Sequence, residues 1–464
     1  MNRVSALNKR LFVSLCALTR TTDRFARTAG VGYFLPALFT DRFANLGGID
    51  KALFASQLDG CRSFEDGEWA GYWRRLAQPH LDSADDALGR LGVWRVAELM
   101  AALNVPTPDS VADKRLQDAL APAVEIFAER CPENTDHLLG DFLARHADRP
   151  AYRDAAVAID ELVKAMTYLF AASWPGWSPQ RLRAYLDSQR IFTILLTSLA
   201  PAMGVEVERM EIQVGDEVAV AYGLFPVGGE KVVATVLTTN GLEGTIQEAL
   251  LPLLRYRHSG LGHVIMEMPG TYSYRHPMSD ASEDIYRGVI DHLLAHPRVD
   301  GQRLAMAGLS FGAYWSTRLA AGNPRVRAVV SNGGPYHRSF QASAGLGMPE
   351  IMLWTLRRTV GATSTVGLTR KLRALSVRHL YPRIDVPVLA INGDRDTLIS
   401  TRDTVDLAHG APTATLLLYP DDDHCAMGHY SEWLRATQEW LQTTLAQGDR
   451  RLISSPPAPG RPTS

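Results

Sequence analysis

The chain has 464 residues, of which 46% are hydrophobic, so it is long enough for two or three domains with substantial cores. Its 48 Lys and Arg against 50 Asp and Glu give a formal net charge of −2, which leaves no basic excess to neutralise a phosphate backbone. This balance argues against nucleic acid as the main partner. The four cysteines, Cys16, Cys61, Cys131 and Cys425, lie far apart without CxxC or zinc-ligand spacing, which favours free thiols in a reducing compartment.

The first twenty residues have a weak likeness to a signal peptide. Residues 2–10 are basic and residues 11–18 are mostly apolar, but the apolar stretch is short, Arg20 interrupts it and no A-x-A cleavage site follows. We interpret this segment as a first amphipathic helix. No apolar run elsewhere approaches the ~20 residues that span a bilayer, so we expect a cytoplasmic protein without a membrane partner.

Residues 1–200 are expected to form a helical N-terminal domain. In the stretch 151–173, Ile159, Leu162 and Met166 recur at spacings of three and four and mark one apolar face of a helix. The segment Trp174-Pro175-Gly176-Trp177 then predicts a turn.

From about residue 205 the pattern changes to strands that alternate with helices. The predicted strands cover 205–214, 218–224, 231–239, 262–268, 303–307, 326–331, 386–392 and 414–419. The predicted helices among them cover 282–296, 311–321, 401–409 and 429–445. Alternation of this kind indicates a mostly parallel sheet flanked by helices.

The same pattern predicts how the rest of the chain is organised. The sheet is expected in two parts, residues 201–335 and 383–446, separated by a helical lid insertion over 336–382 that lacks clear strands. Residues 447–464 contain four prolines and are expected to be a disordered tail.

A G-x-S-x-G pentapeptide, Gly308 to Gly312, directly follows one predicted strand and directly precedes a predicted helix. This setting is typical of the nucleophile elbow of the α/β-hydrolase fold, in which glycines flank a strained turn that exposes the serine. A serine hydroxyl needs a base, and the base needs a group that orients it. We therefore predict Ser310 as a nucleophile, with a plain glycine-bounded turn as the alternative.

The two partners of such a serine are expected after later strands, in the order acid and then histidine. The strand 386–392 ends in Gly393-Asp394-Arg395-Asp396, and the strand 414–419 is followed by a loop that contains His424. We predict Asp396 as the acid and His424 as the general base. Asp394 is the alternative acid, and His429, at the expected start of the last helix, is the alternative base.

Two further groups beside these residues have other interpretations. The run Asp421–Asp423 is compatible with a divalent metal, but a solvated turn is the favoured interpretation, and we expect neither metal nor cofactor. Cys425 is interpreted as a packed neighbour of His424 rather than a second nucleophile.

An oxyanion hole needs two backbone N–H donors. One is expected from Phe311, directly after the nucleophile. The other is expected from the loop after the third strand, Asn240-Gly241-Leu242-Glu243-Gly244, where we predict Leu242 as the donor and Gly241 as the residue that permits close approach. A plain turn is the alternative for this loop.

Several of these segments resemble a known group of hydrolases, which includes the fermentation–respiration switch esterase, the fungal yellowish-green polyketide-shortening hydrolase and 2,6-dihydroxypseudooxynicotine hydrolase. The similar segments are Asn240–Thr245 (N-G-L-E-G-T), Met266–Gly270 (M-E-M-P-G), Val299–Leu304 before the elbow, and the pair His424-Cys425. Asp396 follows Ser310 by 86 residues and His424 follows Asp396 by 28, which also suits the group. The resemblance covers roughly residues 200–445.

The resemblance implies an α/β-hydrolase that cleaves esters or carbon–carbon bonds next to a ketone, with a helical N-terminal domain that helps to roof the active site. After Pro269-Gly270 this chain departs from the group, because Thr271-Tyr272-Ser273-Tyr274 stands where Q-G is common. Tyr272 and Tyr274 are predicted either to bind an aromatic or polyketide substrate or to pack in the core.

The combined hypothesis is a serine hydrolase that cleaves an ester or a ketone-adjacent C–C bond of a fairly large apolar small molecule, a polyketide among the candidates, through an acyl-enzyme. One rival is an acyltransferase or cyclase that uses the same serine. Another rival is a catalytically silent binding protein, against which the intact set of three residues argues. For the N-terminal helices, the alternatives to a roof are stabilisation of the core and a homodimer interface.

Overall fold

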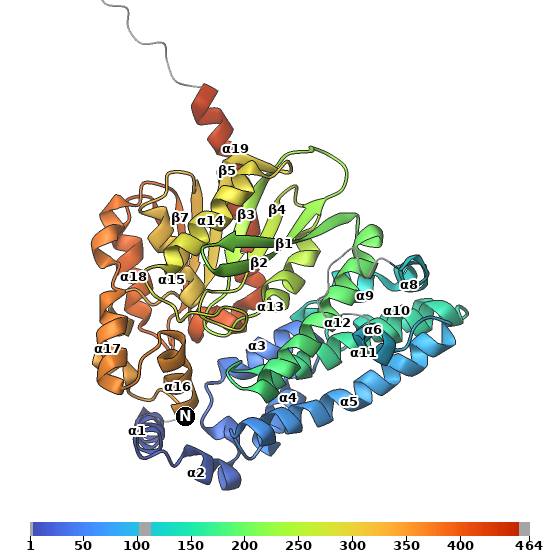
Figure 1. Cartoon of the computed structure of the whole chain (residues 1–464), viewed down its shortest axis with the longest axis horizontal. Helices are drawn as coiled ribbons and strands as arrows, with labels where there is room; N and C mark the ends of the chain where they lie inside the picture. Colours follow the sequence, from blue (N-terminus) through green and yellow to red (C-terminus); the bar gives the residue numbers. More distant parts are fainter. Residues whose placement is uncertain (1–2, 102–112, 454–464) are drawn as a thin grey trace, which may run out of the picture.

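The computed structural model describes residues 3–101 and 113–453 and begins with a helical region (Figure 1). Its helices are α1 (Arg3–Thr19), α2 (Thr22–Ala29), α3 (Leu38–Gly47), α4 (Lys51–Gly60), α5 (Asp66–Arg90), α6 (Val96–Ala101), α8 (Lys114–Leu120), α9 (Glu125–Ala128), α10 (Leu138–Arg145), α11 (Pro150–Ser173) and α12 (Pro179–Met203). Short 3₁₀ turns η1 (Val31–Tyr33), η2 (Ala121–Ala123) and η3 (Pro132–Asn134) join some of them.

Local signals set the ends of the last long helix of this region. The Ser178 hydroxyl accepts a hydrogen bond from the Arg181 N–H at 3.4 Å and caps the start of α12, and Pro179 occupies the first helical position. Gly204 adopts a left-handed conformation with φ of 67° and ends the helix. The chain passes directly from there into the first strand.

One eight-stranded sheet follows. Its strands are β1 (Val205–Val214), β2 (Glu217–Pro226), β3 (Val233–Thr239), β4 (Gly262–Met266), β5 (Val299–Leu309), β6 (Ala328–Asn332), β7 (Val388–Gly393) and β8 (Ala414–Tyr419). Their order is β1-β2-β4-β3-β5-β6-β7-β8, with β1 and β2 antiparallel and the strands from β4 to β8 parallel. The prediction of a mostly parallel sheet flanked by helices is confirmed.

The largest difference from the predicted strand ends is in β5, which begins at Val299 and not at residue 303. The segment from Val299 forms an irregular ladder with β3, because the register shifts between Val233 and Thr235. Asp300 and Gly301 are residue types common in turns, so the sequence did not predict that the strand begins before residue 303.

Helices cover both faces of the sheet. On one face, α14 (Ser282–Ala295), α15 (Phe311–Ala320) and α18 (Thr401–Gly410) pack on a core of their own. On the other face lie α13 (Ile246–Leu250), the turn η4 (Leu251–Tyr256) and α19 (Tyr430–Ile453), and the N-terminal helices share that core.

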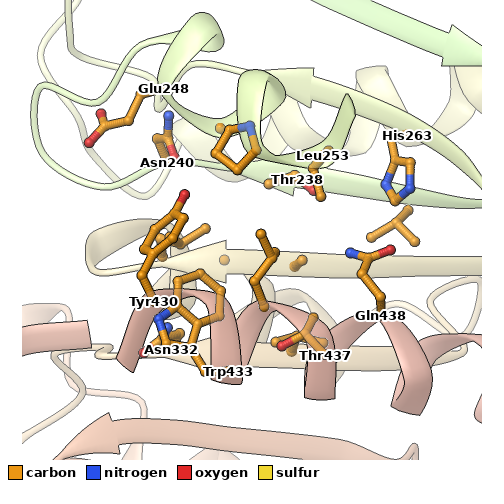
Figure 2. Close-up of a pocket in the computed structure, with 18 of the residues that line it drawn as sticks. Thr238, Asn240, Glu248, Leu253, His263, Asn332, Tyr430, Trp433, Thr437 and Gln438 are labelled. Carbon is orange, nitrogen blue, oxygen red and sulfur yellow. The ribbon is translucent and has the colours of Figure 1, made fainter. Parts of the chain in front are cut away.

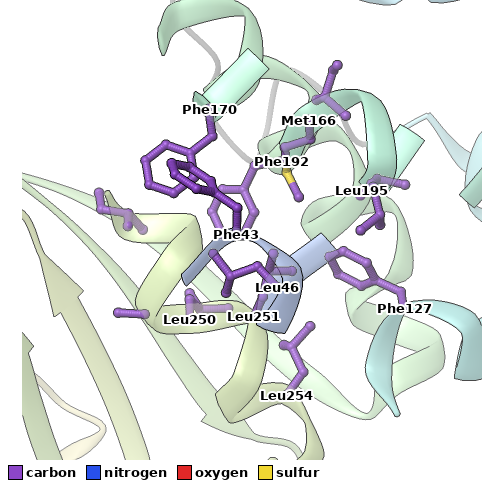
Figure 3. Packing of buried hydrophobic residues seen from close by; sticks show 14 of the residues in the cluster. Phe43, Leu46, Phe127, Met166, Phe170, Phe192, Leu195, Leu250, Leu251 and Leu254 are labelled. Atoms are coloured by element: carbon purple, nitrogen blue, oxygen red, sulfur yellow. The ribbon is translucent and has the colours of Figure 1, made fainter. Parts of the chain in front are cut away.

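The helical region and the sheet are therefore joined by continuous apolar packing. Figure 3 shows Phe43, Phe170 and Phe192 of the N-terminal helices beside Leu250 and Leu254 of α13 and η4. The helical region lies against this face of the sheet rather than beside it on a linker.

The insertion between β6 and β7 is helical. It contains η5 (Arg338–Phe340), η6 (Ala342–Gly345), α16 (Glu350–Thr359), α17 (Thr365–Ala374) and η7 (Arg378–Arg383). Helix α1 lies beside it (Figure 1), where Arg10 donates to the Leu346 carbonyl at 2.8 Å and the Gly347 N–H donates to the Ser14 hydroxyl at 2.7 Å.

At the C-terminal end, η8 (His424–His429) leads into α19, which runs through Ile453, beyond the predicted end at 445. The remainder of the tail, 454–464, lies outside the described residues. Within residues 3–101 and 113–453, no helix has both the length and the hydrophobicity to cross a lipid bilayer.

Candidate active site

Ser310 lies at the turn between β5 and α15. Its φ of 53° and ψ of −122° are strained for a residue with a side chain, and its N–H is held by the Asn332 carbonyl of β6 at 2.7 Å. The neighbouring glycines have no room for a Cβ atom, which would lie 2.3 Å from the Gly312 carbonyl at Gly308 and 2.1 Å from the Thr239 carbonyl at Gly312. The sequence G-x-S-x-G is thus required by the close packing of this turn.

Three predicted residues meet at the carboxyl edge of the sheet. The Ser310 Oγ lies 2.8 Å from Nε2 of His424, and Nδ1 of His424 lies 2.8 Å from Oδ2 of Asp396. The Asp396 side chain is fully buried and the His424 side chain is 5% exposed. A continuous hydrogen-bonded chain therefore joins residues that are far apart in the sequence.

The Asp396 carboxylate is fixed by the loop that carries it. Oδ1 accepts the N–H groups of Leu398 and Ile399, both at 2.8 Å, and Oδ2 accepts the Asn392 side-chain amide at 2.9 Å. This leaves Oδ2 directed at His424.

The alternative acid and base have other partners. The Asp394 carboxylate accepts the Asp421 N–H at 2.8 Å, and Nδ1 of His429 bonds to Oδ2 of Asp422 at 2.8 Å. The structure brings Asp396 and His424 to Ser310, but neither Asp394 nor His429.

Two opposing effects act on the pKa of His424. Burial lowers it, whereas the Asp396 carboxylate raises it, and the net result is a pKa well above its ordinary value of 6.5. The carboxylate thus favours the imidazolium form, which is the form that a histidine takes after accepting a proton.

The loop after β3 packs directly on Ser310. A Cβ atom at Gly241 would lie 2.5 Å from the Ser310 Cβ and 2.9 Å from the Phe311 nitrogen, so this position must be glycine. Leu242 borders the same space as Ser310 and His424. Phe311 is the first residue of α15, where backbone N–H groups have no partner within the helix.

This loop is braced by the helical region, a feature that the sequence did not reveal. Arg42 of α3 donates to the Glu243 carbonyl at 2.9 Å and forms a pair of bonds of 2.6 and 2.8 Å to the Glu248 carboxylate. The Gly176 N–H donates to the Glu243 carboxylate at 2.7 Å. Burial raises the pKa of Glu243 to about 7, against the lowering effects of the Gly176 N–H and Arg42.

Two cavities meet at Ser310 and His424. The larger has about 880 Å³ of empty space, its mouth included, and lies under the insertion. Its lining is mainly apolar and includes Phe311, Phe340, Met348, Met352, Leu353, Leu356, Leu368 and Leu372. The other cavity extends toward the helical region, where Phe39, Arg42 and Trp174 line it.

Tyr272 and Tyr274 line neither of these cavities. Tyr272 stacks on Tyr185 with ring centroids 4.3 Å apart, and its hydroxyl donates to the Glu243 carbonyl at 3.1 Å. Tyr274 packs against the core on the other face of the sheet. Both rings make packing contacts, which is one of the two predicted alternatives, and substrate binding by them stays a prediction.

Each carboxylate of the acidic run after β8, Asp421–Asp423, has an ion-pair or hydrogen-bond partner within the protein. Asp421 pairs with Arg395, Asp422 with His429, and the Asp423 carboxylate accepts the Thr397 N–H at 2.7 Å. No group of three or more His, Cys, Asp or Glu side chains within residues 3–101 and 113–453 has a metal-binding arrangement. Cys425 is buried.

Comparison with known proteins gives the family of the chain. Residues 136–446, more than half of the chain, match the model of the FrsA-like esterases. The chain belongs to the FrsA-like esterase family. The resemblance found in the sequence motifs is confirmed, and the protein is an α/β-hydrolase enzyme.

Curated relatives in this family are esterases FrsA. That of Photobacterium profundum is 25% identical over 295 residues, which cover 60% of this chain and 69% of the relative. That of Vibrio cholerae is 25% identical over 262 residues, which cover 54% of this chain and 62% of the relative. The match thus spans about two thirds of the length of these FrsA-like relatives.

Two solved structures have the same fold at 20% identity. The 2,6-dihydroxy-pseudo-oxynicotine hydrolase superposes with a TM-score of 0.55 over 78% of this chain and 96% of its own. AbyA5 superposes with a TM-score of 0.53 over 67% of this chain and 91% of its own. Both matches extend beyond the sheet of this FrsA-like protein into its helical region.

Proposed function

We propose that this esterase-family enzyme is a serine hydrolase in which Ser310 is the nucleophile, His424 the general base and Asp396 the acid that orients the base. The observation that carries the proposal is the hydrogen-bonded chain from the Ser310 hydroxyl through both nitrogens of His424 to a buried carboxylate. A serine in this arrangement gains a proton acceptor that is held in the correct tautomer.

In the first half of the reaction, the Ser310 Oγ attacks the carbonyl carbon while Nε2 of His424 takes its proton. The backbone N–H groups of Phe311 and Leu242 are proposed to stabilise the developing oxyanion. The imidazolium then protonates the leaving group, the bond to that group breaks, and an acyl-Ser310 remains.

In the second half, a water molecule attacks the acyl carbon and gives its proton to His424. The bond to the Ser310 Oγ breaks, that oxygen regains the proton, and the carboxylic acid leaves. Each half needs a neutral His424 at its start, passes through an imidazolium, and returns His424 to the neutral form, which suits a histidine whose charged form is favoured by Asp396.

We propose a fairly large apolar substrate. The support is the mainly apolar lining of the cavity under the insertion, which opens onto Ser310 and His424. The bond cleaved is an ester or a C–C bond next to a ketone, as in a polyketide.

The test of the nucleophile is labelling with a fluorophosphonate probe. Wild type should be labelled at Ser310 and inactivated in step with labelling, and Ser310→Ala should be unlabelled and inactive with an unchanged melting temperature. Labelling of another serine would overturn the assignment.

Activity should also persist in EDTA without added cofactor; loss on chelation and recovery with one divalent ion would contradict a metal-free mechanism.

The test of the substrate class compares kcat/KM for p-nitrophenyl acetate, a long-chain p-nitrophenyl ester and an aryl β-diketone. A large apolar site should favour the long-chain ester or the diketone over the acetate by about tenfold or more, since each buried CH₂ contributes about 0.8 kcal/mol. Higher kcat/KM for the acetate than for both larger substrates would contradict the proposal.

A further inference from the structure

An internal chamber lies behind the nucleophile, between the sheet and α19 (Figure 2). Thr238 and His263 line it from the strands, and Tyr430, Trp433 and Gln438 face them from the helix. The space open to the centres of water-sized spheres is about 50 Å³. At roughly 10 to 15 Å³ for each water, this is room for about three to five water molecules.

Polar atoms without a partner gather around this chamber. They are Nδ1 and Nε2 of His263, Oδ1 of Asn332, Nε1 of Trp433, Oγ1 of Thr437 and Oε1 of Gln438. Each belongs to a side chain that is at most 3% exposed, and none has a hydrogen-bond partner within the protein. Figure 2 shows these residues arranged on the two sides of one space.

Such a set is costly if the chamber is dry. A buried polar group without a hydrogen bond costs about 1 to 3 kcal/mol, and six such atoms in one place would be a large penalty for a protein of ordinary stability. Burial lowers the pKa of His263 to about 4, so at neutral pH its ring is uncharged and offers one donor and one acceptor. The six atoms together therefore suit a neutral ligand that both donates and accepts hydrogen bonds.

The chamber adjoins the cavity that Ser310 and His424 border. Five residues line both spaces, namely Arg42, Asn240, Glu248, Leu309 and Met427. Leu309 and Asn332 also flank the nucleophile, one by preceding it in the chain and the other by accepting its N–H. A molecule in the chamber is thus separated from the active site by a single layer of side chains.

We propose that this chamber holds an ordered cluster of water molecules and supplies the water that hydrolyses the acyl-enzyme. The second part rests on the proposed function of Ser310. A large apolar acyl group in the cavity under the insertion restricts access of bulk water from that side, whereas the chamber shares no lining residue with that cavity and adjoins the other cavity at Ser310. A water that enters from the chamber attacks the acyl carbon, gives its proton to Nε2 of His424, and displaces the Ser310 Oγ.

The variant that tests the cluster removes two of its anchors. Thr437→Val with Gln438→Leu keeps the size of both side chains and removes their polar atoms, and Thr437→Ser is the matched control because it keeps the hydroxyl. Magnetic relaxation dispersion of water oxygen, with a crystal structure that orders solvent, counts the long-lived internal waters. Wild type and the control should hold the cluster and the double variant should lose it. A dry chamber in wild type overturns the proposal.

The supply of water to the reaction is measured by competition with methanol. At a fixed methanol concentration, the acyl-enzyme partitions between methyl ester and carboxylic acid, and this ratio does not depend on which step limits turnover. The ratio should rise about fivefold in the double variant and remain at the wild-type value in Thr437→Ser. An unchanged ratio in a variant that has lost its waters refutes the supply role.

Either single variant, Thr437→Val or Gln438→Leu, replaces the double variant if that protein does not fold. Failure of the proposed function is distinguishable, because it appears as absent fluorophosphonate labelling of Ser310 while the count of internal waters is unaffected.

Discussion

At the residue scale, His424 lies between a hydroxyl and a buried carboxylate, and this position determines how the reaction responds to pH. Only the neutral imidazole accepts a proton from Ser310, so kcat/KM should rise as the pH rises through the pKa of His424. Because Asp396 holds that pKa well above 6.5, against the effect of burial, the rise should be centred above this value.

The Asp396→Asn variant tests this coupling. Without the carboxylate the imidazolium loses its stabilisation, so the pKa of His424 should fall and the acid limb of the kcat/KM profile should move to lower pH. The maximal rate should also fall by about 10³- to 10⁴-fold, because the amide no longer fixes the tautomer. A lower rate with an unmoved acid limb would show that another group titrates in this range.

Substitution also tests whether His424 or His429 is the general base. His424→Ala should reduce kcat by about 10⁴-fold or more, whereas His429→Ala, which loses a bond to Asp422 and a ring contact with Tyr419, should remain within about threefold of wild type. Steady-state kinetics of the two variants measure this difference, and circular dichroism checks that both are folded. Inactivity of His429→Ala alone would reassign the base.

The positions of Ser310, Asp396 and His424 were predictable because they depend on local chain geometry. Ser310 stands between a strand and a helix, and Asp396 and His424 follow the ends of two later strands, so a parallel sheet brings them to one edge. The sequence left two interpretations of Tyr272 open, because the direction of a side chain in a turn depends on contacts such as that with Tyr185, which is distant in the sequence.

At the scale of elements, the loop after β3 is held by helix α3 of the N-terminal region. Arg42 bonds to the carbonyl of Glu243 and to Glu248, so it fixes the loop on which Leu242 lies. No sequence motif marks Arg42, because its partners lie some 200 residues away and become neighbours only when the helical region packs on the sheet. The prediction of the elements themselves succeeded because hydrophobic periodicity is local.

The Arg42→Met variant should show whether this brace matters for turnover. It keeps much of the side-chain volume but removes the bonds to the loop, so the proposed oxyanion donors should be misplaced. We expect kcat to fall by about 10- to 100-fold, with a smaller change in KM, since the loss acts mainly on the transition state.

The matched control is Arg74→Met on α5, which loses an ion pair with Asp187 but has no contact with the loop. This control should keep the wild-type kcat. Equal losses in both variants, or an Arg42→Met enzyme with a wild-type kcat, would show that the brace has no part in catalysis.

At the scale of the whole molecule, the helical region and the sheet are parts of one folded body. A single apolar cluster includes residues of α3, α5, α11 and α12 together with one face of the sheet, and α13 and α19 belong to it. The helical region therefore covers apolar surface of the sheet and also holds the loop after β3 through Arg42. Removal of the helical region would expose this apolar surface and the loop after β3 to water.

This shared core predicts one cooperative unfolding transition. Tryptophan fluorescence reports on the helical region when Trp69, Trp73 and Trp174 are retained and the tryptophans after residue 204 are replaced by Phe, whereas backbone circular dichroism reports on the whole molecule and hydrolytic activity on the active site. Because the interface between helices and sheet is as apolar as a domain core, the three signals should be lost at the same temperature or denaturant concentration. A protein of residues 205–464 alone should aggregate, since it would present the uncovered face of the sheet to water. Loss of tryptophan burial several degrees below the loss of activity would instead show that the helical region unfolds by itself and that the sheet and active site are stable without it.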